Sequence, residues 1–359
     1  MATTAEYGLG EFTFPRGWFM IGEANEATNK PKAIRYFGQD MVLYRGESGR
    51  VVVMEAYCPH MGTHFANNDT SYIVMDGKQI DGDAIRCPYH GWRFNAEGQC
   101  DEIPYSPAPI PEKACIKSWP AQEWGGCIFI WYDEENGAPD YDLPALPEWE
   151  DTAWVNWKLD HLGILECHPQ EIIDNITDKA HLGPIHGSQD MQYFETEFKG
   201  HVVSQLLAAG HRTLSDDVLT NETWYTGPGI LMSRMLGFYP SLMLITHTPV
   251  EDGTVRAWHA LLVKSSNDVA NDDDVKSARE YQEGSRLAFM QDFDVWANKR
   301  PCFQIMQVVG DGPFAKARIW YEQFYNPREK AKSFQDRVNG KYISKGTIRD
   351  PWEEKGAAE

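Results

Sequence analysis

The chain has 359 residues, a formal net charge of -20 and a sequence pI near 4.9. A surface this acidic argues against nucleic acid or an anionic membrane as a partner. The hydrophobic content of 42 % suffices for the cores of about two domains. Residues 1–11 are polar and carry no signal-peptide core, and no apolar run approaches the roughly 18 residues that a membrane span needs.

Short strands and turns are predicted for residues 12–135, because β-rich runs alternate there with turn residues. The clearest runs are 17–22, 41–45, 51–54 and 127–132. The segment 66–83 is polar and rich in turn residues. We therefore expect an all-β domain over residues 12–135, followed by a linker near 135–152.

Two short segments of this domain combine thiol and imidazole donors. The first contains Cys58 and His60, and the second, after 26 intervening residues, contains Cys87 and His90. A Rieske [2Fe–2S] cluster needs this mixed supply, because two Cys hold one iron and two His hold the other. A structural zinc site also uses Cys and His, but usually as a Cys pair followed by a His pair. The pattern therefore favours a Rieske cluster.

Cysteine usage separates this cluster from one class of Rieske protein. High-potential respiratory Rieske proteins add two Cys that form a disulfide across the cluster loops, and Thr63 and Tyr89 stand at those positions here. The five cysteines outside the cluster are scattered without the spacing of a disulfide framework: Cys100, Cys115, Cys127, Cys167 and Cys302. Both observations favour an oxygenase or ferredoxin type in a reducing cytoplasm.

The second half of the chain is predicted to mix helix and sheet. A helix is expected over residues 166–182, strands between about 200 and 263, and a charged helix over 274–298. His181 and His186 lie in this half, and Asp178 precedes His181 by three positions, which would place both on one helical face. Two His and one carboxylate are the ligand set of non-haem Fe(II) oxygenases. Many helices carry such trios without a metal, so the cluster in the same chain is what makes this interpretation attractive.

Large apolar groups in the predicted strands are candidates for a substrate pocket, although each of them could equally be ordinary sheet core. Arg234 is the only charged residue between 230 and 245 and could anchor an acidic substrate. His247 follows an apolar run and could also line the pocket. The candidate pocket residues are Trp224, Tyr225, Met232, Arg234, Met235, Phe238, Tyr239, Met243 and His247.

Over nearly its whole length the chain resembles the oxygenase component of Rieske non-haem iron oxygenases, and most of all the 3-ketosteroid 9α-hydroxylase group. The similarity is carried by the two cluster segments and by stretches on both sides of them. These stretches are residues 16–18, 56–62, 86–90, 101–105, 171–175, 178–186, 291–299 and 319–325.

The resemblance implies an α+β fold, in which an all-β Rieske domain precedes a catalytic domain with a helix packed on an antiparallel sheet, of the helix-grip type. We expect the catalytic domain over residues 150–326 and a C-terminal tail over 327–359. It also implies His181, His186 and Asp292 as ligands of a mononuclear iron, with Asp294 as the nearest rival of Asp292. Asn175 would lie near this iron.

By the same resemblance, Asp178 is not a ligand. The matching aspartate in the family bridges a cluster His of one subunit and an iron His of the next, and here the two would be His90 and His181. A carboxylate in this position orients both imidazoles through hydrogen bonds. This role implies a ring of subunits, usually a homotrimer, because the two metals of one chain lie too far apart in the family for efficient transfer.

Three departures from the steroid hydroxylases stand out. The spacing between the cluster segments is longer, so residues 66–83 resemble an insertion. Gly91 follows His90 where Asp is common, and Gly187 follows His186 where an aromatic residue is usual. The first two should alter the lid of the cluster, whereas the third lies beside the iron and bears on substrate specificity.

The predicted function is that of an oxygenase component that hydroxylates an apolar, steroid-like substrate. It would use O2 and electrons from a separate NAD(P)H-dependent reductase with flavin or iron–sulfur groups. One alternative is an O- or N-demethylase of an aromatic substrate. A further alternative is an electron-transfer protein without a catalytic iron.

Overall fold

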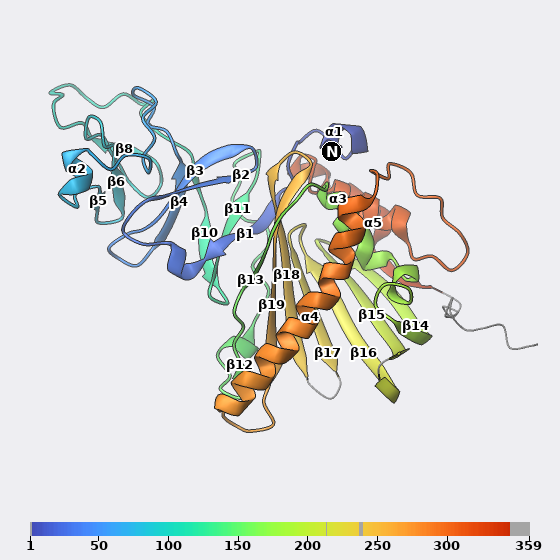
Figure 1. Cartoon of the computed structure of the whole chain (residues 1–359). Helices are drawn as coiled ribbons and strands as arrows, with labels where there is room; N and C mark the ends of the chain where they lie inside the picture. Colours follow the sequence, from blue (N-terminus) through green and yellow to red (C-terminus); the bar gives the residue numbers. More distant parts are fainter. Residues whose placement is uncertain (1, 213, 237–239, 345–359) are drawn as a thin grey trace, which may run out of the picture. The chain divides into compact units, whose positions relative to one another are not determined.

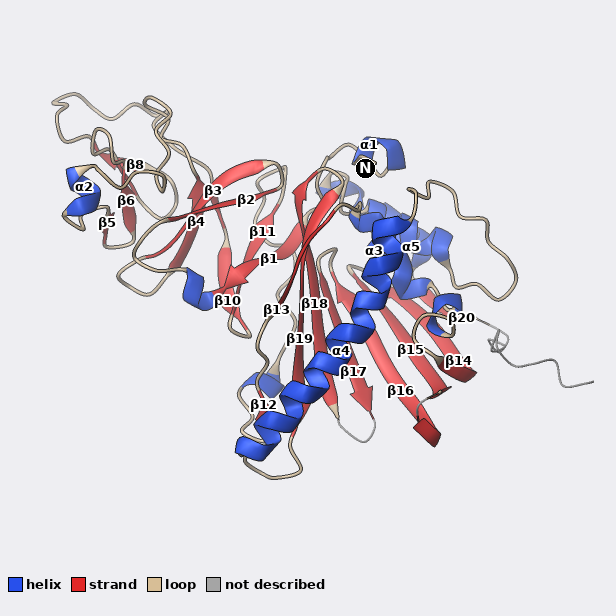
Figure 2. Cartoon of the chain, viewed as in Figure 1, coloured by secondary structure: helices blue, strands red, loops and turns tan. Residues whose placement is uncertain are grey.

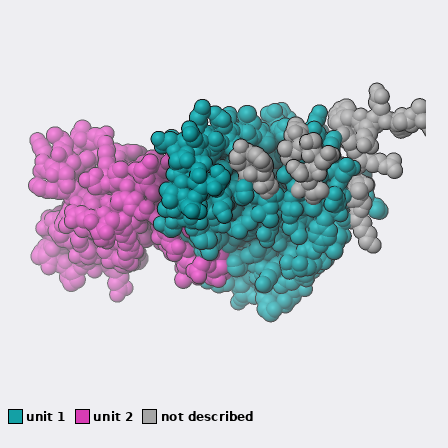
Figure 3. Space-filling view, turned by 90° about the horizontal axis from the view of Figure 1, so that it is seen from below, with its two compact units in different colours: residues 1–17, 143–359 teal, residues 18–142 magenta. Residues whose placement is uncertain are grey.

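The computed structural model describes residues 2–212, 214–236 and 240–344, traced in Figure 1. The chain divides into two compact units, coloured in Figure 3. The smaller unit is Trp18–Asp142, and the larger unit combines Met1–Gly17 with Leu143–Glu359. No described helix is both long and apolar enough to cross a lipid bilayer.

The described residues of the smaller unit form three small sheets, with strand orders β1-β11-β10, β2-β3-β4-β9 and β5-β6-β7-β8 (Figure 2). Every residue of β11 is buried, as its uninterrupted apolar and aromatic sequence requires. The strands are β1 (Gly17–Glu23), β2 (Lys32–Tyr36), β3 (Gln39–Arg45), β4 (Val51–Glu55), β5 (Ile80–Asp81), β6 (Ala84–Arg86), β7 (Arg93–Phe94), β8 (Cys100–Glu102), β9 (Ser118–Trp119), β10 (Ala121–Trp124) and β11 (Cys127–Tyr132). One short helix, α2 (Tyr72–Met75), lies within residues 66–83.

The larger unit is built on one antiparallel sheet, in which the described residues form nine strands in the order β12-β19-β18-β17-β16-β15-β14-β20, with β13 also paired to β19. The strands are β12 (Trp154–Val155), β13 (Asp160–Leu165), β14 (Ser188–Lys199), β15 (Val202–His211), β16 (Leu214–Thr226), β17 (Ile230–Leu236), β18 (Ser241–Glu251), β19 (Thr254–Lys264) and β20 (Gly340–Ile343).

A long helix, α4 (Asp272–Asn298), crosses this sheet over β18 and β19 (Figure 1). Asn271 caps it by accepting hydrogen bonds from the N–H groups of residues 273 and 274, and three Asp in its first turn suit the positive end of the helix dipole. The other helices of the larger unit are α1 (Thr4–Tyr7), α3 (Pro169–Asp174), α5 (Phe314–Glu322) and α6 (Ala331–Val338).

The predicted α+β fold, an all-β unit followed by a helix on an antiparallel sheet, is confirmed. The helix predicted over residues 166–182 is wrong as a continuous helix. It consists of α3 followed by two single 3-10 turns, Asn175–Thr177 and Ala180–Leu182. Within the segment expected as a tail, α6 and β20 are ordered elements, and β20 pairs with β14.

Candidate metal centres

Two loops of the smaller unit repeat one backbone pattern around the predicted cluster ligands. The N–H of Cys58 donates to the carbonyl of Thr63 at 2.9 Å, and the N–H of Gly62 donates to the carbonyl of Cys58 at 2.9 Å. The loop at Cys87 makes the same two bonds at the same sequence offsets, at 2.8 and 3.0 Å. Each loop needs a glycine four residues after its Cys, because φ there is +73° at Gly62 and +74° at Gly91.

The side chains of these loops fit a [2Fe–2S] cluster. Cys58 and Cys87 are buried as free thiols, and a hydrogen bond from Cys58 lowers the pKa of Cys87 below its usual range. The imidazoles of His60 and His90 lie 4.7 Å apart, centroid to centroid. Nδ1 of His60 is buried without a hydrogen-bond partner, an arrangement that costs free energy unless the nitrogen binds something else. Two thiols and two imidazoles are the Rieske donor set.

Aromatic side chains and the segment 66–83 surround these loops. The indole of Trp92 stacks on His60 at 4.5 Å between ring centroids, and its N–H donates to the hydroxyl of Tyr105 at 2.9 Å. From the segment 66–83, the hydroxyl of Ser71 donates to the carbonyl of Pro88 at 2.6 Å. The segment therefore packs on the second cluster loop.

In the larger unit, His181, His186 and Asp292 bring one ligand atom each to a common point, all within 4.8 Å of one another. Nε2 of His186 lies 3.2 Å from one carboxylate oxygen of Asp292, and Nε2 of His181 lies 4.0 Å from the other. Asp292 is 5 % exposed, and the amide of Asn175 donates to it at 3.4 Å. The structure thus brings Asp292 to the two imidazoles, while Asp294 is exposed.

The position of Asp178 follows from the break in the predicted helix. Asp178 is extended, with φ -82° and ψ 91°, and its carboxylate accepts hydrogen bonds from the N–H groups of Ala180 at 3.0 Å and His181 at 3.3 Å. This capping starts a new turn, so Asp178 does not share a helical face with His181. Nδ1 of His181 instead lies 2.5 Å from the carbonyl of Asp178 and 3.8 Å from its carboxylate.

This contact settles the orientation of the His181 ring. When Nδ1–H donates to Asp178, Nε2 keeps its lone pair and faces Asp292, as a metal-binding imidazole requires. Burial alone would lower the pKa of His181, but the carboxylates of Asp178 and Asp292 raise it overall. Asp178 is therefore suited to orient His181 rather than to bind the metal.

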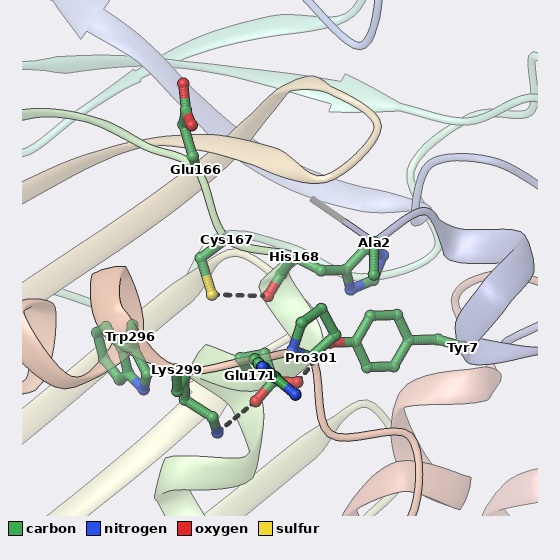
Figure 4. A pocket seen from close by; sticks show the side chains of 10 residues that line it. Ala2, Tyr7, Glu166, Cys167, His168, Glu171, Trp296, Lys299 and Pro301 are labelled. Atoms are coloured by element: carbon green, nitrogen blue, oxygen red, sulfur yellow. Dashed lines mark hydrogen bonds and ion pairs between the residues drawn. The ribbon is translucent and has the colours of Figure 1, made fainter.

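A buried carboxylate on α3 ties together elements on both sides of this metal site. Glu171 accepts hydrogen bonds from the hydroxyl of Tyr7 and from the N–H of Cys302, the latter at 2.8 Å, and pairs with Lys299 beyond the end of α4. Figure 4 shows these side chains around a small cavity of about 90 Å³. The N-terminal segment, α3 and the end of α4 are thereby joined at one carboxylate.

A second buried carboxylate on α3, Asp174, binds α5. Nη2 and Nε of Arg318 donate to Asp174 at 2.5 and 3.1 Å, and the amide of Gln170 donates to it at 3.0 Å. Burial raises the pKa of Asp174 against the pull of Arg318. Because Asn175 follows directly, this ion pair fixes the start of the segment that leads to His181.

We expect Arg318→Met to destabilise the larger unit by about 3–5 kcal/mol, because it leaves Asp174 buried without its cation. Lys332→Met is a matched control, since Lys332 pairs with Asp336 at an exposed position and its loss should change stability little. Urea unfolding followed by circular dichroism measures both variants. Equal midpoints for the two variants would contradict the expectation.

We call the face of the sheet toward α4 the inner face. Side chains along a strand alternate between the two faces, so the strand register shows which predicted pocket residues lie on the inner face. Leu261 of β19 packs against Ala278 of α4 and therefore lies on the inner face. The pairing of β19 with β18, β18 with β17 and β17 with β16 places His247 and Tyr225 on the same face. The hydroxyl of Tyr225 and Nε2 of His247 are 3.1 Å apart, and burial lowers the pKa of His247 to about 3, so its ring is neutral. Two predicted pocket residues lie outside the described residues: Phe238 and Tyr239.

Three of the pocket candidates lie on the opposite face of the sheet. Trp224 and Met232 pair across β16 and β17, one residue out of phase with the inner face. Arg234 shares their face, and its guanidinium donates to Glu148 at 2.8 Å. The structure thus turns Arg234 away from the candidate iron site and already pairs it with a carboxylate, so the prediction that these three residues line the substrate pocket is not supported by the register.

Comparisons with known proteins match both units to known families. Residues 17–120 match the family described as the Rieske [2Fe-2S] domain, and residues 130–325 match the 3-ketosteroid 9alpha-hydroxylase C-terminal domain. The chain is 31 % identical over 329 residues to a 3-ketosteroid-9-alpha-monooxygenase oxygenase component of Mycolicibacterium smegmatis, covering 87 % of this chain and 82 % of the relative. It is 29 % identical to a cholesterol 7-desaturase of Caenorhabditis elegans, covering 87 % and 77 %.

Solved structures share the fold at lower identity. NdmA of Pseudomonas putida CBB5, as a QL mutant with caffeine, gives a TM-score of 0.69 at 17 % identity, covering 91 % of this chain and 96 % of that one. Dicamba monooxygenase bound to dicamba gives 0.63 at 16 % identity, covering 94 % and 99 %. The predicted Rieske cluster and oxygenase activity are confirmed. The chain therefore belongs to the 3-ketosteroid 9α-hydroxylase family of Rieske-type oxygenase components.

Proposed function

We propose that this oxygenase hydroxylates an apolar, steroid-like substrate at a mononuclear iron held by His181, His186 and Asp292. The observation that carries the proposal is the convergence of these three donors in a unit that belongs to the 3-ketosteroid 9α-hydroxylase family. Iron bound there would supply O2-dependent oxidation of a substrate C–H bond. In this proposal residues 12–135 hold the cluster and residues 150–326 hold the iron and the substrate.

The chain's own residues contribute orientation and exclusion of water. The carbonyl of Asp178 holds the His181 ring with Nε2 toward the metal position, and Asn175 does the same for the carboxylate of Asp292. Leu182, between the two His, packs on the apolar side chains of Phe194 and Leu207. These contacts keep one side of the metal position dry and its ligand atoms in place.

Electrons are proposed to come from a separate NAD(P)H-dependent reductase, as the term oxygenase component in the relatives' names suggests. We further propose a homotrimer in the cytoplasm, in which Asp178 lies between His181 and His90 of a neighbouring subunit. One contact and one exposure support this bridge: Nδ1 of His181 faces Asp178, and the His90 side chain is partly exposed.

Demethylation of a methoxylated or N-methylated aromatic compound is the second candidate. Its support is the fold shared with NdmA and dicamba monooxygenase, at identities that carry fold alone. The predicted cationic anchor for an aromatic acid, Arg234, is paired with Glu148 on the face opposite to α4. This pairing weighs against an acidic aromatic substrate and favours the steroid.

Mass spectrometry of products formed from labelled O2 tests the proposal. The reduced, iron-loaded enzyme is offered 3-ketosteroids in one reaction and methoxylated or N-methylated aromatics in another. One labelled oxygen gained by a steroid is the expected result, whereas loss of a methyl group with formaldehyde would support the demethylase. An electron-transfer protein without a catalytic iron would turn over neither pool and would hold two irons per chain instead of three.

A further inference from the structure

The inner face of the sheet carries a polar cluster between two apolar walls. Ser233 of β17 pairs with Met243 of β18, whose sulfur is 3.5 Å from the hydroxyl of Ser285 on α4, so Ser233 points toward α4. Thr223 is opposite Ser233 on β16, and Asn221 lies two residues before Thr223 on the same face. Asn221, Thr223 and Ser233 therefore form one cluster on the inner face.

Two hydrogen bonds within this cluster run from Thr223 to Ser233 and from Ser233 to Asn221. The hydroxyl of Ser233 donates to the side-chain oxygen of Asn221 at 2.7 Å, and Thr223 lies 2.8 Å from the same Ser233 hydroxyl. Because the single Ser233 proton is used toward Asn221, Thr223 must be the donor in the second bond. The oxygen of Asn221 is thereby engaged, and its amide nitrogen keeps two donors that make no hydrogen bond with a described residue.

The Asn221 side chain is partly accessible. Ser233 is completely buried, whereas Asn221 and Thr223 are only partly buried, although β16 has a paired strand on each side. Their apolar inner-face neighbours Leu231 and Met235 are also only partly buried. Among the described residues, four side chains on the inner face of β16 and β17 therefore remain partly accessible.

Both metal-bearing elements border this part of the sheet. On one side, Met235 and Met243 pack with Ala278 of α4, the helix that also carries Asp292. On the other side, Leu182 packs on inner-face side chains of β14 and β15. In the sheet, β16 and β17 lie between β18 and β15, as Figure 1 shows.

We propose that the amide of Asn221 donates a hydrogen bond to a neutral oxygen, such as a ketone, of the substrate bound over β16 and β17. This specificity role rests on the proposed steroid function and names the group of the substrate that is recognised. A donor held in place by Ser233 and Thr223 selects an acceptor oxygen, while Leu231, Met235 and Met243 contact an apolar skeleton. Carboxylates are disfavoured, because Arg234 points to the opposite face.

Three steroid probes test this role: androst-4-ene-3,17-dione and its two analogues that each lack one ketone oxygen. Their dissociation constants are measured by calorimetry with the iron-loaded enzyme and with Asn221→Leu, which keeps the size of the side chain but removes its donors. Glu222→Gln is the control, because Glu222 is the neighbouring residue on the other face of β16. Ser233→Ala is a milder second variant that frees the Asn221 amide to rotate.

Asn221→Leu is expected to raise the dissociation constants of the dione and of one mono-ketone about three- to tenfold, which corresponds to the loss of one net hydrogen bond. The dissociation constant of the other mono-ketone should not change. Ser233→Ala should raise the dissociation constants of the same two probes to a smaller extent. Glu222→Gln should leave all three dissociation constants unchanged. Equal weakening of all three probes, or of none, overturns the role of Asn221 while hydroxylation by the wild type can still stand. Failure of the wild type to bind any of the probes overturns the steroid function together with this inference.

Discussion

Asp292→Ala is expected to remove the mononuclear iron and to abolish turnover while the Rieske cluster remains. Asp292 is the only carboxylate of the three clustered donors, so its loss leaves two neutral imidazoles for a divalent cation. Mutation of a group that only orients a metal ligand typically lowers metal affinity or activity by roughly 10–100-fold. Mutation of a direct ligand should lower them by more. Iron analysis should fall from three to two atoms per chain, with an unchanged visible spectrum of the cluster.

Asp294→Ala provides the matched control on the same helix. Two residues along an α-helix turn the side chain by about 200°, so Asp294 points away from the site and is exposed. This variant should keep three irons and normal turnover. Retention of iron by Asp292→Ala, or its loss from Asp294→Ala, would contradict the assignment of the ligand.

How far the sequence predicts these sites depends on how locally each ligand is specified. The Rieske ligands occupy two short segments with the same spacing from Cys to Gly, and the twin loops of the structure reproduce that symmetry. Asp292 lies on α4, more than 100 residues after His186, and no local pattern separates it from Asp294. Its selection came from family resemblance, and the packing of α4 on the sheet provides the physical reason.

The broken helix has a local physical cause, and the strand register divides the predicted pocket residues between two faces. The prediction of one helix over 166–182 did not take into account that Asp178 can cap the following turn. This capping competes with continuation of the helix. The pocket prediction took Trp224 and Tyr225 together, although neighbours on a strand point to opposite faces. Strict alternation from Tyr225 would have suggested Asn221 and Thr223 instead, but the sequence alone does not say which face α4 covers.

The buried ion pairs of α3 had no sequence signal at all. Glu171 and Asp174 meet Lys299 and Arg318, which are more than 120 positions away and lie just after α4 and within α5. A charged residue on a short helix is normally solvated, so the sequence gives no reason to expect it in the core. Only the tertiary fold shows that these carboxylates join the segments that carry the metal ligands.

Asp178→Asn is expected to lower turnover by roughly 10–100-fold with all three irons retained, because an amide cannot accept hydrogen bonds from two imidazoles as a carboxylate does. His181 stays in place through the carbonyl of Asp178, which the substitution preserves. Iron analysis and the rate of cluster oxidation in a single turnover separate this effect from loss of metal. Normal cluster oxidation in the variant would contradict the bridging role.

Mixed subunits decide whether Asp178 acts between chains, as the proposed trimer requires. Asp178→Asn chains keep an intact cluster, and Cys87→Ser chains lack the cluster but keep Asp178, so each variant alone should be nearly inactive. When the two are coexpressed, the cluster of the first can serve Asp178 and His181 of the second. When equal amounts of the two chains mix at random in a ring, about one junction between neighbouring subunits in four joins an intact cluster to an intact Asp178. Recovery of about a quarter of wild-type turnover is therefore expected, whereas transfer within one chain would restore none.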